Sequence, residues 1–194
     1  MRLILASASP RRRGLLRQAG FEFDIQPSQV AEEIQPGERP EEFARRAARD
    51  KAIQIAASSP PGSLVLGADT VVVVGGETLG KPRDREDATR MLRLLSGRTH
   101  QVHTGICLVR TPAEIKALEH ETTFVTFREI DEEEIRCYVE SGEPLDKAGA
   151  YAIQGLASKF VTRISGCYSN VVGLPVARVY GILKPLMKAV GSGQ

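Results

Sequence analysis

The sequence has no tryptophan, and aromatic residues of all kinds make up only 5% of its 194 residues. Aromatic platforms on which bases stack are therefore not expected. A strong basic excess is missing too: the formal net charge is +2, whereas nucleic-acid-binding domains concentrate positive charge on one face or element. We expect no nucleic-acid partner.

Long apolar runs are also missing. No stretch approaches the ~20 residues that a membrane-spanning helix needs, and the apolar residues 3–6 are far too few for a signal peptide. We expect a protein with no membrane partner and a cytoplasmic location. The cysteines Cys107, Cys137 and Cys167 are odd in number and lack metal-type spacing. In a cytosolic protein they are expected to be reduced and mostly buried.

What is present is an ordinary globular composition, with 42% hydrophobic and 26% charged residues. It predicts one domain of two lobes over residues 1–188, followed by a flexible tail over 189–194. The fold class is α/β, with a mixed, partly antiparallel sheet flanked by helices. Strands are expected near 2–6, 21–25, 64–74, 101–109, 122–128, 160–164 and 169–172, and helices after Ser9-Pro10, over 41–57, after Asp84, from Asp131 to Val139 and from Pro175. Gly75-Gly76 predicts a tight hairpin turn.

The carboxylate of Asp69 interrupts an apolar run from Leu64 to Val74. The flanking aliphatic residues predict a buried strand, and a buried carboxylate is costly unless cations, hydrogen bonds or a metal compensate it. Asp69 therefore belongs either to a functional site or to a strand end, where Gly67 would mark a bend. This segment alone does not favour one interpretation over the other.

The segment from Ser7 to Arg13 places three arginines in the first turn of a helix, where the free N–H groups already favour negative charge. Amide donors, hydroxyls and guanidinium groups together make an anion site. We assign phosphate binding to Ser7, Arg11 and Arg12, and a solvated surface to Arg13.

Two lysines add positive charge. Lys51 lies in the small apolar stripe of the expected helix over 41–57, where it would either snorkel to the edge or neutralise a nearby triphosphate. Lys81 ends a segment that fits the opening of a Walker A motif, but Pro82 stands where Ser or Thr is needed and disfavours the helix that must follow. We reject the P-loop. Lys81 could still direct its ammonium at a phosphate or at a carboxylate.

The histidines give no metal signal. His100 and His103 are three residues apart on an expected strand and so face opposite sides; we expect these and His120 to be core or surface residues. No Gly-x-Ser-x-Gly elbow supports a serine hydrolase. The glycine-punctuated segment from Glu143 to Gly155 is either a surface loop or a ligand loop, in which Gln154 offers a donor and an acceptor to a base edge.

Together these segments resemble the Maf family of nucleoside triphosphate pyrophosphatases, over roughly residues 3–183. The matching blocks, in the family's order, are Leu3-Ile4-Leu5-Ala6-Ser7-Ala8-Ser9-Pro10-Arg11-Arg12, Gly67-Ala68-Asp69-Thr70-Val71-Val72 with Gly80-Lys81-Pro82-Arg83-Asp84, and Asp146-Lys147-Ala148-Gly149-Ala150-Tyr151-Ala152-Ile153-Gln154-Gly155. Asp69-Thr70 and Ile153-Gln154-Gly155 resemble the branch acting on dTTP and UTP rather than on 7-methyl-GTP. Two departures are Ala152, where glycine is common, and the third arginine, Arg13.

The resemblance implies the fold of Maf and inosine-triphosphatase-like proteins and hydrolysis of pyrimidine nucleoside triphosphates, including modified forms, between the α and β phosphates. The products would be a nucleoside monophosphate and pyrophosphate. It implies that Asp69 is the proton acceptor. The other implied catalytic residues are Lys81, Lys51 and Glu32; the substrate-binding residues are Ser7, Arg11, Arg12, Thr70 and Gln154, of which Arg11, Thr70 and Gln154 would set base preference.

The resemblance also implies a divalent cation, Mg²⁺ or Mn²⁺, held by Asp69 and Glu32, although the match does not separate Glu32 from Glu33. Whether Asp69 acts as base, metal ligand or both stays open. The expected partner is the nucleotide substrate, and a homodimer is compatible with the pattern. The alternative function is a nucleotide-binding regulator of septum formation with little turnover, against which the complete set of Asp, Lys, Arg and Gln residues argues.

Overall fold

The computed structural model describes residues 2–191, which form two compact units. The first unit comprises the residues up to Asp69, Thr104–Glu121 and the residues from Gly173 onward; the second comprises Thr70–His103 and Thr122–Val172. Three long strands contribute residues to both units: β3 (Leu64–Val74), β5 (Thr99–Arg110) and β6 (Glu114–Phe127).

In the described residues, the strands hydrogen-bond in the order β2-β1-β3-β5-β6-β7, and β4 pairs with β3. The remaining strands are β1 (Leu3–Leu5), β2 (Asp24–Ile25), β4 (Glu77–Leu79) and β7 (Val161–Ser165). β1 is parallel to β2 and to β3, whereas the β3–β4 and β6–β7 pairs are antiparallel. The prediction of a mixed, partly antiparallel sheet flanked by helices is confirmed.

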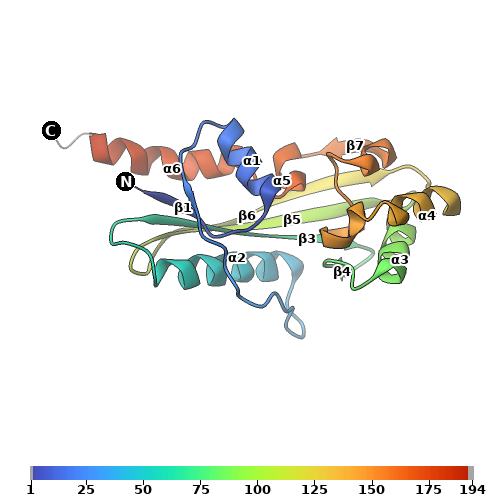
Figure 1. Cartoon of the computed structure of the whole chain (residues 1–194), viewed down its shortest axis with the longest axis horizontal. Helices are drawn as coiled ribbons and strands as arrows, with labels where there is room; N and C mark the ends of the chain where they lie inside the picture. The colour runs from blue at the N-terminus through green and yellow to red at the C-terminus, as the bar shows by residue number, and fades with distance from the viewer. Residues whose placement is uncertain (1, 192–194) are drawn as a thin grey trace. The chain divides into compact units, whose positions relative to one another are not determined.

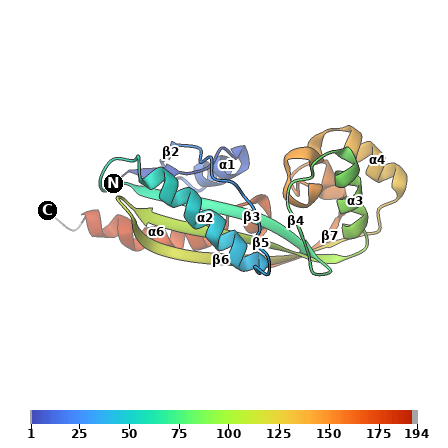
Figure 2. The same ribbon diagram turned by 90° about the horizontal axis from the view of Figure 1, so that it is seen from below.

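In the first unit, α2 (Pro40–Ala56) and α6 (Val176–Gly191) lie on opposite faces of the strands (Figures 1 and 2). α2 presents its small residues to β1, β3 and β5, in a buried cluster of Ile4, Ala6, Ala48, Ala52, Ile55, Ala56, Val65, Cys107 and Val109. α1 (Pro10–Gln18) starts as predicted, with Ser9 as its N-cap and Pro10 as its first residue.

Two glycines allow α2 to lie directly on the strands. A Cβ atom on Gly67 of β3 would lie 2.1 Å from the carbonyl oxygen of Ala48, and one on Gly105 of β5 would lie 2.1 Å from the carbonyl oxygen of Ala44. Both distances are far below van der Waals contact. Because Gly67 lies inside continuous strand β3, the interpretation of this residue as a bend is wrong.

We expect Gly105→Ala to lower the free energy of unfolding by about 3 kcal/mol, because the added methyl group meets backbone atoms that no side-chain rotation can move away. Chemical denaturation measures the change. Gly181→Ala in α6 is the matched control: its Cβ meets nothing within 4 Å, so it should be neutral or stabilise by up to about 1 kcal/mol. Unchanged stability in Gly105→Ala would mean that α2 does not rest on β5.

In the second unit, local sequence signals are confirmed. β3 turns into β4 through Gly75 and Gly76, with φ of 58° and 85°, which is the predicted tight hairpin. The side chain of Asp84 caps α3, and Asp131 and Glu134 form the predicted capping box of α4. These helices, α3 (Arg85–Leu95) and α4 (Glu132–Glu140), pack side by side (Figure 2).

One predicted strand is wrong: residues 169–172 lie in a short helix, α5 (Tyr168–Val172). The buried amide of Asn170 donates to the carbonyl oxygen of Val102 and to Thr123 Oγ1, both at 3.0 Å. These tertiary hydrogen bonds outweigh the strand preference of the neighbouring valines. Other boundaries differ too, since the strand expected over 21–25 shrinks to two residues and the one expected from 122 begins at Glu114.

The cysteines are all free thiols, but only Cys107 is buried; Cys167 is partly exposed and Cys137 is exposed. The prediction of mostly buried thiols is therefore wrong for Cys137, which lies on α4. Helix α6 is described through Gly191, and residues 192–194 of the expected tail lie outside the described residues. Between residues 2 and 191, no helix has both the length and the apolar character needed to cross a bilayer.

Candidate active site

A buried ion pair joins α2 to β3 in the first unit. The Nζ atom of Lys51 lies 2.5 Å from Oδ1 of Asp69, and the two side chains are only 7% and 6% exposed. Lys51 lies on the same face of α2 as Ala48 and Ala52, so the close approach of this helix to the strands brings its ammonium to the carboxylate. Lys51 is thus a buried counter-charge, and the interpretation that it snorkels to the edge is wrong.

A second carboxylate contacts the same ammonium. Glu32 Oε1 lies 2.5 Å from Lys51 Nζ, with its side chain 39% exposed. The next residue, Glu33, instead uses its backbone carbonyl oxygen to accept a hydrogen bond from Arg46 at 2.7 Å. The structure therefore places the Glu32 carboxylate on the same ammonium as Asp69, which favours Glu32 over Glu33 as the acidic residue of the candidate site.

The electrostatic environment of Asp69 has opposing parts. Burial raises its pKa, because desolvation penalises the ionised form, and the negative charge of Glu32 acts in the same direction. The positive charges of Lys51 and Arg12 lower the pKa. A carboxylate with a raised pKa is a better proton acceptor than an ordinary one, provided that nearby cations keep it ionised.

Arg12 is held in place by neutral oxygen atoms. Its Nε donates to the carbonyl oxygen of Gly173 at 2.8 Å, and its Nη1 donates to Ser7 Oγ at 3.2 Å. Ser7 Oγ also accepts from the backbone N–H of Ser9, at 3.2 Å. Burial lowers the pKa of Arg12, while attraction to the two carboxylates raises it. These contacts help to orient the guanidinium.

The other two arginines of the segment differ in setting. Arg11 is partly exposed, and its charge acts on Arg12, lowering the pKa of that guanidinium by repulsion. Arg13 is exposed, as expected for a solvated residue. Arg11, Arg12 and Lys51 are three cations, whereas the neighbouring carboxylates Asp69 and Glu32 are two. A polyanion at the start of α1 would restore the balance.

Three predicted site residues belong to the second unit. Thr70 lies on β3 and is partly exposed, while Lys81 and Gln154 are exposed. The segments of these two residues are joined, because the N–H of Gly149 donates to the carbonyl oxygen of Gly80 at 3.0 Å. The late loop is therefore anchored next to Lys81.

The histidines of β5 have separate partners. His100 Nε2 lies 2.8 Å from the hydroxyl of Tyr151, while His103 contacts Thr122 Oγ1 and Gln101 Oε1, both at 3.0 Å. These contacts place the two rings against different neighbours, the arrangement expected for residues three apart on a strand. Burial lowers the pKa of His100 to about 4, so it is neutral at neutral pH. The sequence did not predict the hydrogen bond between His100 and Tyr151. The one hint was that Tyr151 lies in the family block from Asp146 to Gly155.

Asp69 and Glu32 are the predicted metal ligands, and both carboxylates contact one ammonium nitrogen, so their oxygen atoms lie close enough together to hold one ion. Over residues 2–191, no group of three or more His, Cys, Asp or Glu side chains is arranged to hold a metal. Two carboxylates without nitrogen or sulfur ligands fit Mg²⁺ or Mn²⁺, which complete their coordination with water and substrate oxygens.

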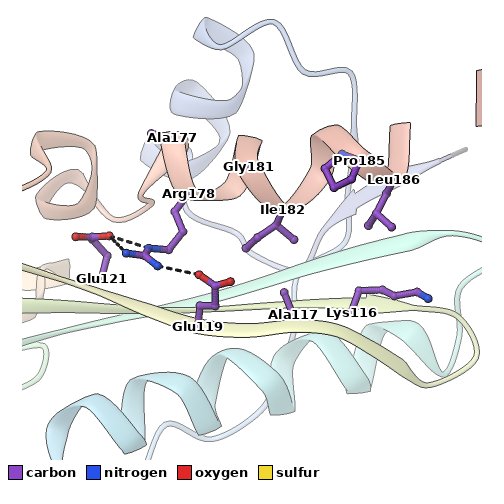
Figure 3. A pocket seen from close by; sticks show the side chains of 10 residues that line it. All are labelled: Lys116, Ala117, Glu119, Glu121, Ala177, Arg178, Gly181, Ile182, Pro185 and Leu186. Carbon is purple, nitrogen blue, oxygen red and sulfur yellow. Dashed lines mark hydrogen bonds and ion pairs between the residues drawn. The ribbon is translucent and has the colours of Figure 1, made fainter. Parts of the chain in front are cut away.

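A separate groove of about 680 Å³ lies between β6 and α6 of the first unit (Figure 3). Arg178 spans it, pairing with Glu119 at 2.8 Å and with Glu121 at 2.6 Å. Ile182 and Leu186 belong to its apolar side. None of the predicted site residues lines this groove, and we assign it no part in the site.

Comparison with known proteins places the chain in a family. The model of the family described as Maf-like protein matches residues 2–186. A dTTP/UTP pyrophosphatase of Koribacter versatilis is 54% identical, covering 95% of this chain and 94% of that protein. Proteins of the same name from Ruminiclostridium cellulolyticum (46% identical, 97% of each chain) and Anaeromyxobacter dehalogenans (52% identical, 94% and 93%) also match. The chain belongs to the Maf-like protein family.

Proposed function

We propose that this chain hydrolyses the pyrimidine nucleoside triphosphates dTTP and UTP between the α and β phosphates. The full-length relatives named dTTP/UTP pyrophosphatase support the substrate class. The observation that carries the chemistry is the buried Asp69 carboxylate, held between Lys51 and the charge of Arg12. Such a group can accept a proton beside a highly charged anion.

The proposed reaction is an attack of water on the α-phosphorus. Asp69 accepts a proton from the water molecule as its oxygen bonds to phosphorus. The bond from that phosphorus to the bridging oxygen breaks, and pyrophosphate leaves with the electron pair. Arg11, Arg12 and Lys51 neutralise the phosphates and the charge that develops on the leaving group. Lys51 also keeps Asp69 ionised.

The remaining predicted residues receive roles by type and by family match. Ser7 positions Arg12, to which it is hydrogen-bonded, and Lys81 supplies a further cation to the phosphates. By the family match, Arg11, Thr70 and Gln154 would set the base preference. We propose that the enzyme acts in the cytoplasm without a nucleic-acid or membrane partner.

We assign a divalent cation, Mg²⁺ or Mn²⁺, to Asp69 and Glu32. When bound, such an ion would polarise phosphate oxygens and lower the pKa of coordinated water. The chain's own contribution is two hard oxygen donors, positioned in advance by their shared contact with Lys51.

A nucleotide panel with Mg²⁺ and Mn²⁺, with products separated by ion-exchange chromatography, tests the proposal. We expect dTTP and UTP to give nucleoside monophosphate and pyrophosphate in equal amounts, with kcat/KM at least about tenfold above that for CTP or the purine nucleotides. Release of orthophosphate from the substrate would contradict the cleavage position. Binding without products would favour the septum-formation regulator, and light scattering on the same preparation distinguishes a monomer from a homodimer.

A further inference from the structure

Gln154 lies at the tip of a turn whose two ends are buried or tethered. The N–H of Gly155 donates to the carbonyl oxygen of Ala152 at 3.0 Å, which makes Ile153 and Gln154 the central residues of a turn. Ile153 is 7% exposed and Tyr151 is 6% exposed, whereas Gln154 is exposed. The side chain proposed to read the base therefore projects from a backbone segment that is otherwise packed.

Tyr151 ties the start of this turn to β5. Its hydroxyl lies 2.8 Å from Nε2 of His100, which is only 1% exposed. The two rings and Phe127 contact one another edge to face, with centroid distances of 4.9 Å for His100–Phe127, 5.3 Å for His100–Tyr151 and 4.9 Å for Phe127–Tyr151. Because His100 is buried and neutral, this tether does not depend on pH near neutrality.

The two residues just before Tyr151 have an unfavourable backbone conformation that neighbouring contacts must maintain. Gly149 and Ala150 both have left-handed backbone conformations, with φ of 68° and 57°. That conformation is unfavourable for alanine, so the surrounding contacts must maintain it. A Cβ atom on Gly149 would lie 2.8 Å from Val72, so this backbone is pressed against β3.

Tyr138 of α4 and Glu143, which follows that helix, hydrogen-bond to the backbone on both sides of the turn. Glu143 accepts hydrogen bonds from the hydroxyl of Tyr138 at 2.9 Å and from the N–H of Leu156 at 3.0 Å. The Tyr138 hydroxyl in turn accepts from the N–H of Ala152 at 3.3 Å. Two sets of contacts therefore hold the turn. One is the hydrogen bond of Tyr151 to His100 on β5, and the other is formed by Tyr138 and Glu143.

A fixed turn matters for base selection because of the symmetry of the glutamine amide. Uracil and thymine present O4 as an acceptor, whereas cytosine presents a donor at the same position. Gln154 has both a donor and an acceptor, so rotating its amide by half a turn makes it match either base. The amide can favour one of these bases only while its distance from the base is held constant, because a turn that moves weakens the hydrogen bonds to either base and so reduces the preference.

We propose that His100 and Tyr151 are a positioning pair, whose buried hydrogen bond holds the turn presenting Gln154 and thereby sets the preference for uracil and thymine over cytosine. The inference rests on the proposed function, since it concerns the substrate preference of that site. Neither residue contacts the reacting atoms in this assignment; both act through Gln154.

The test is Tyr151→Phe, which removes the hydroxyl and leaves the ring in its cluster. We expect the UTP-to-CTP ratio of kcat/KM to fall about tenfold, the effect of one lost hydrogen bond, through a higher KM for UTP at nearly constant kcat. The same ratio is measured as Kd for α,β-methylene analogues, so base preference is tested even without turnover. Tyr168→Phe, at a tyrosine 47% exposed in the same unit, is the matched control and should leave both ratios unchanged.

A merely structural role has a different signature. If Tyr151→Phe lowers the melting temperature while the UTP-to-CTP ratio stays at its wild-type value, the proposal is overturned. The double variant His100→Phe/Tyr151→Phe removes both polar partners and should recover stability while the ratio stays low; a restored ratio would also overturn it. Wild-type protein that binds the UTP analogue selectively but releases no pyrophosphate would contradict the proposed function alone.

Discussion

Asp69→Asn is expected to slow pyrophosphate release from dTTP and UTP about a thousandfold or more, because it removes the proposed proton acceptor and one of two oxygen donors for the metal. The folded structure should persist. The substitution keeps the shape of the side chain and removes a charge that is costly to bury, while Lys51 keeps its contact with Glu32 at 2.5 Å. Steady-state kinetics with product identification measures the loss, and circular dichroism with denaturation verifies the fold.

The matched control for that variant is Asp24→Asn. Asp24 pairs with Arg2 at the surface, where its side chain is 51% exposed, so neither activity nor stability should change noticeably. If Asp69→Asn kept a tenth or more of wild-type turnover, Asp69 would not be the proton acceptor. A loss that excess Mn²⁺ restores would instead assign Asp69 chiefly to metal binding.

Lys51→Met is expected to lower the free energy of unfolding by about 3–5 kcal/mol at neutral pH, since it leaves the buried Asp69 carboxylate without the ammonium that contacts it. Methionine is of similar length, so lost packing contributes little. The pKa of Asp69 should rise further, because the positive charge of Lys51 lowers this pKa more than the positive charge of Arg12 does. The neutral acid needs no counter-charge, so the destabilisation is greatest above this raised pKa and shrinks as pH falls through it.

Activity should report the same shift. The acid limb of the pH profile of kcat/KM requires ionised Asp69 and should move to higher pH in Lys51→Met, on top of an overall loss of about a hundredfold from weaker phosphate neutralisation. Denaturation and kinetics at several pH values measure both effects. Lys184→Met, at an exposed lysine of α6, should alter neither. Equal destabilisation at low and high pH would show that Asp69 does not depend on Lys51.

The parts of the fold that are predictable from sequence are those whose contacts are local. The Ser9-Pro10 helix start, the Asp84 cap and the Asp131–Glu134 capping box each involve hydrogen bonds between residues only a few positions apart. The Gly75-Gly76 turn depends on the positive φ that glycine adopts without cost. Residues 169–172 show the limit, because the contacts of Asn170 with Val102 and Thr123 turn a strand-like sequence into a helix.

For the candidate site, the sequence by itself determined the residue types: an isolated carboxylate in an apolar strand, a cluster of cations, and a glutamine in a glycine-rich turn. It also determined the family, through the order of three blocks. Only the tertiary structure decided that Lys51 is buried against Asp69, that Glu32 rather than Glu33 joins them, and that His100 holds Tyr151. The physical reason is sequence separation. These partners are 18, 19 and 51 residues apart, and they meet because Gly67 and Gly105 let α2 lie on the strands and because the late loop folds back onto β5.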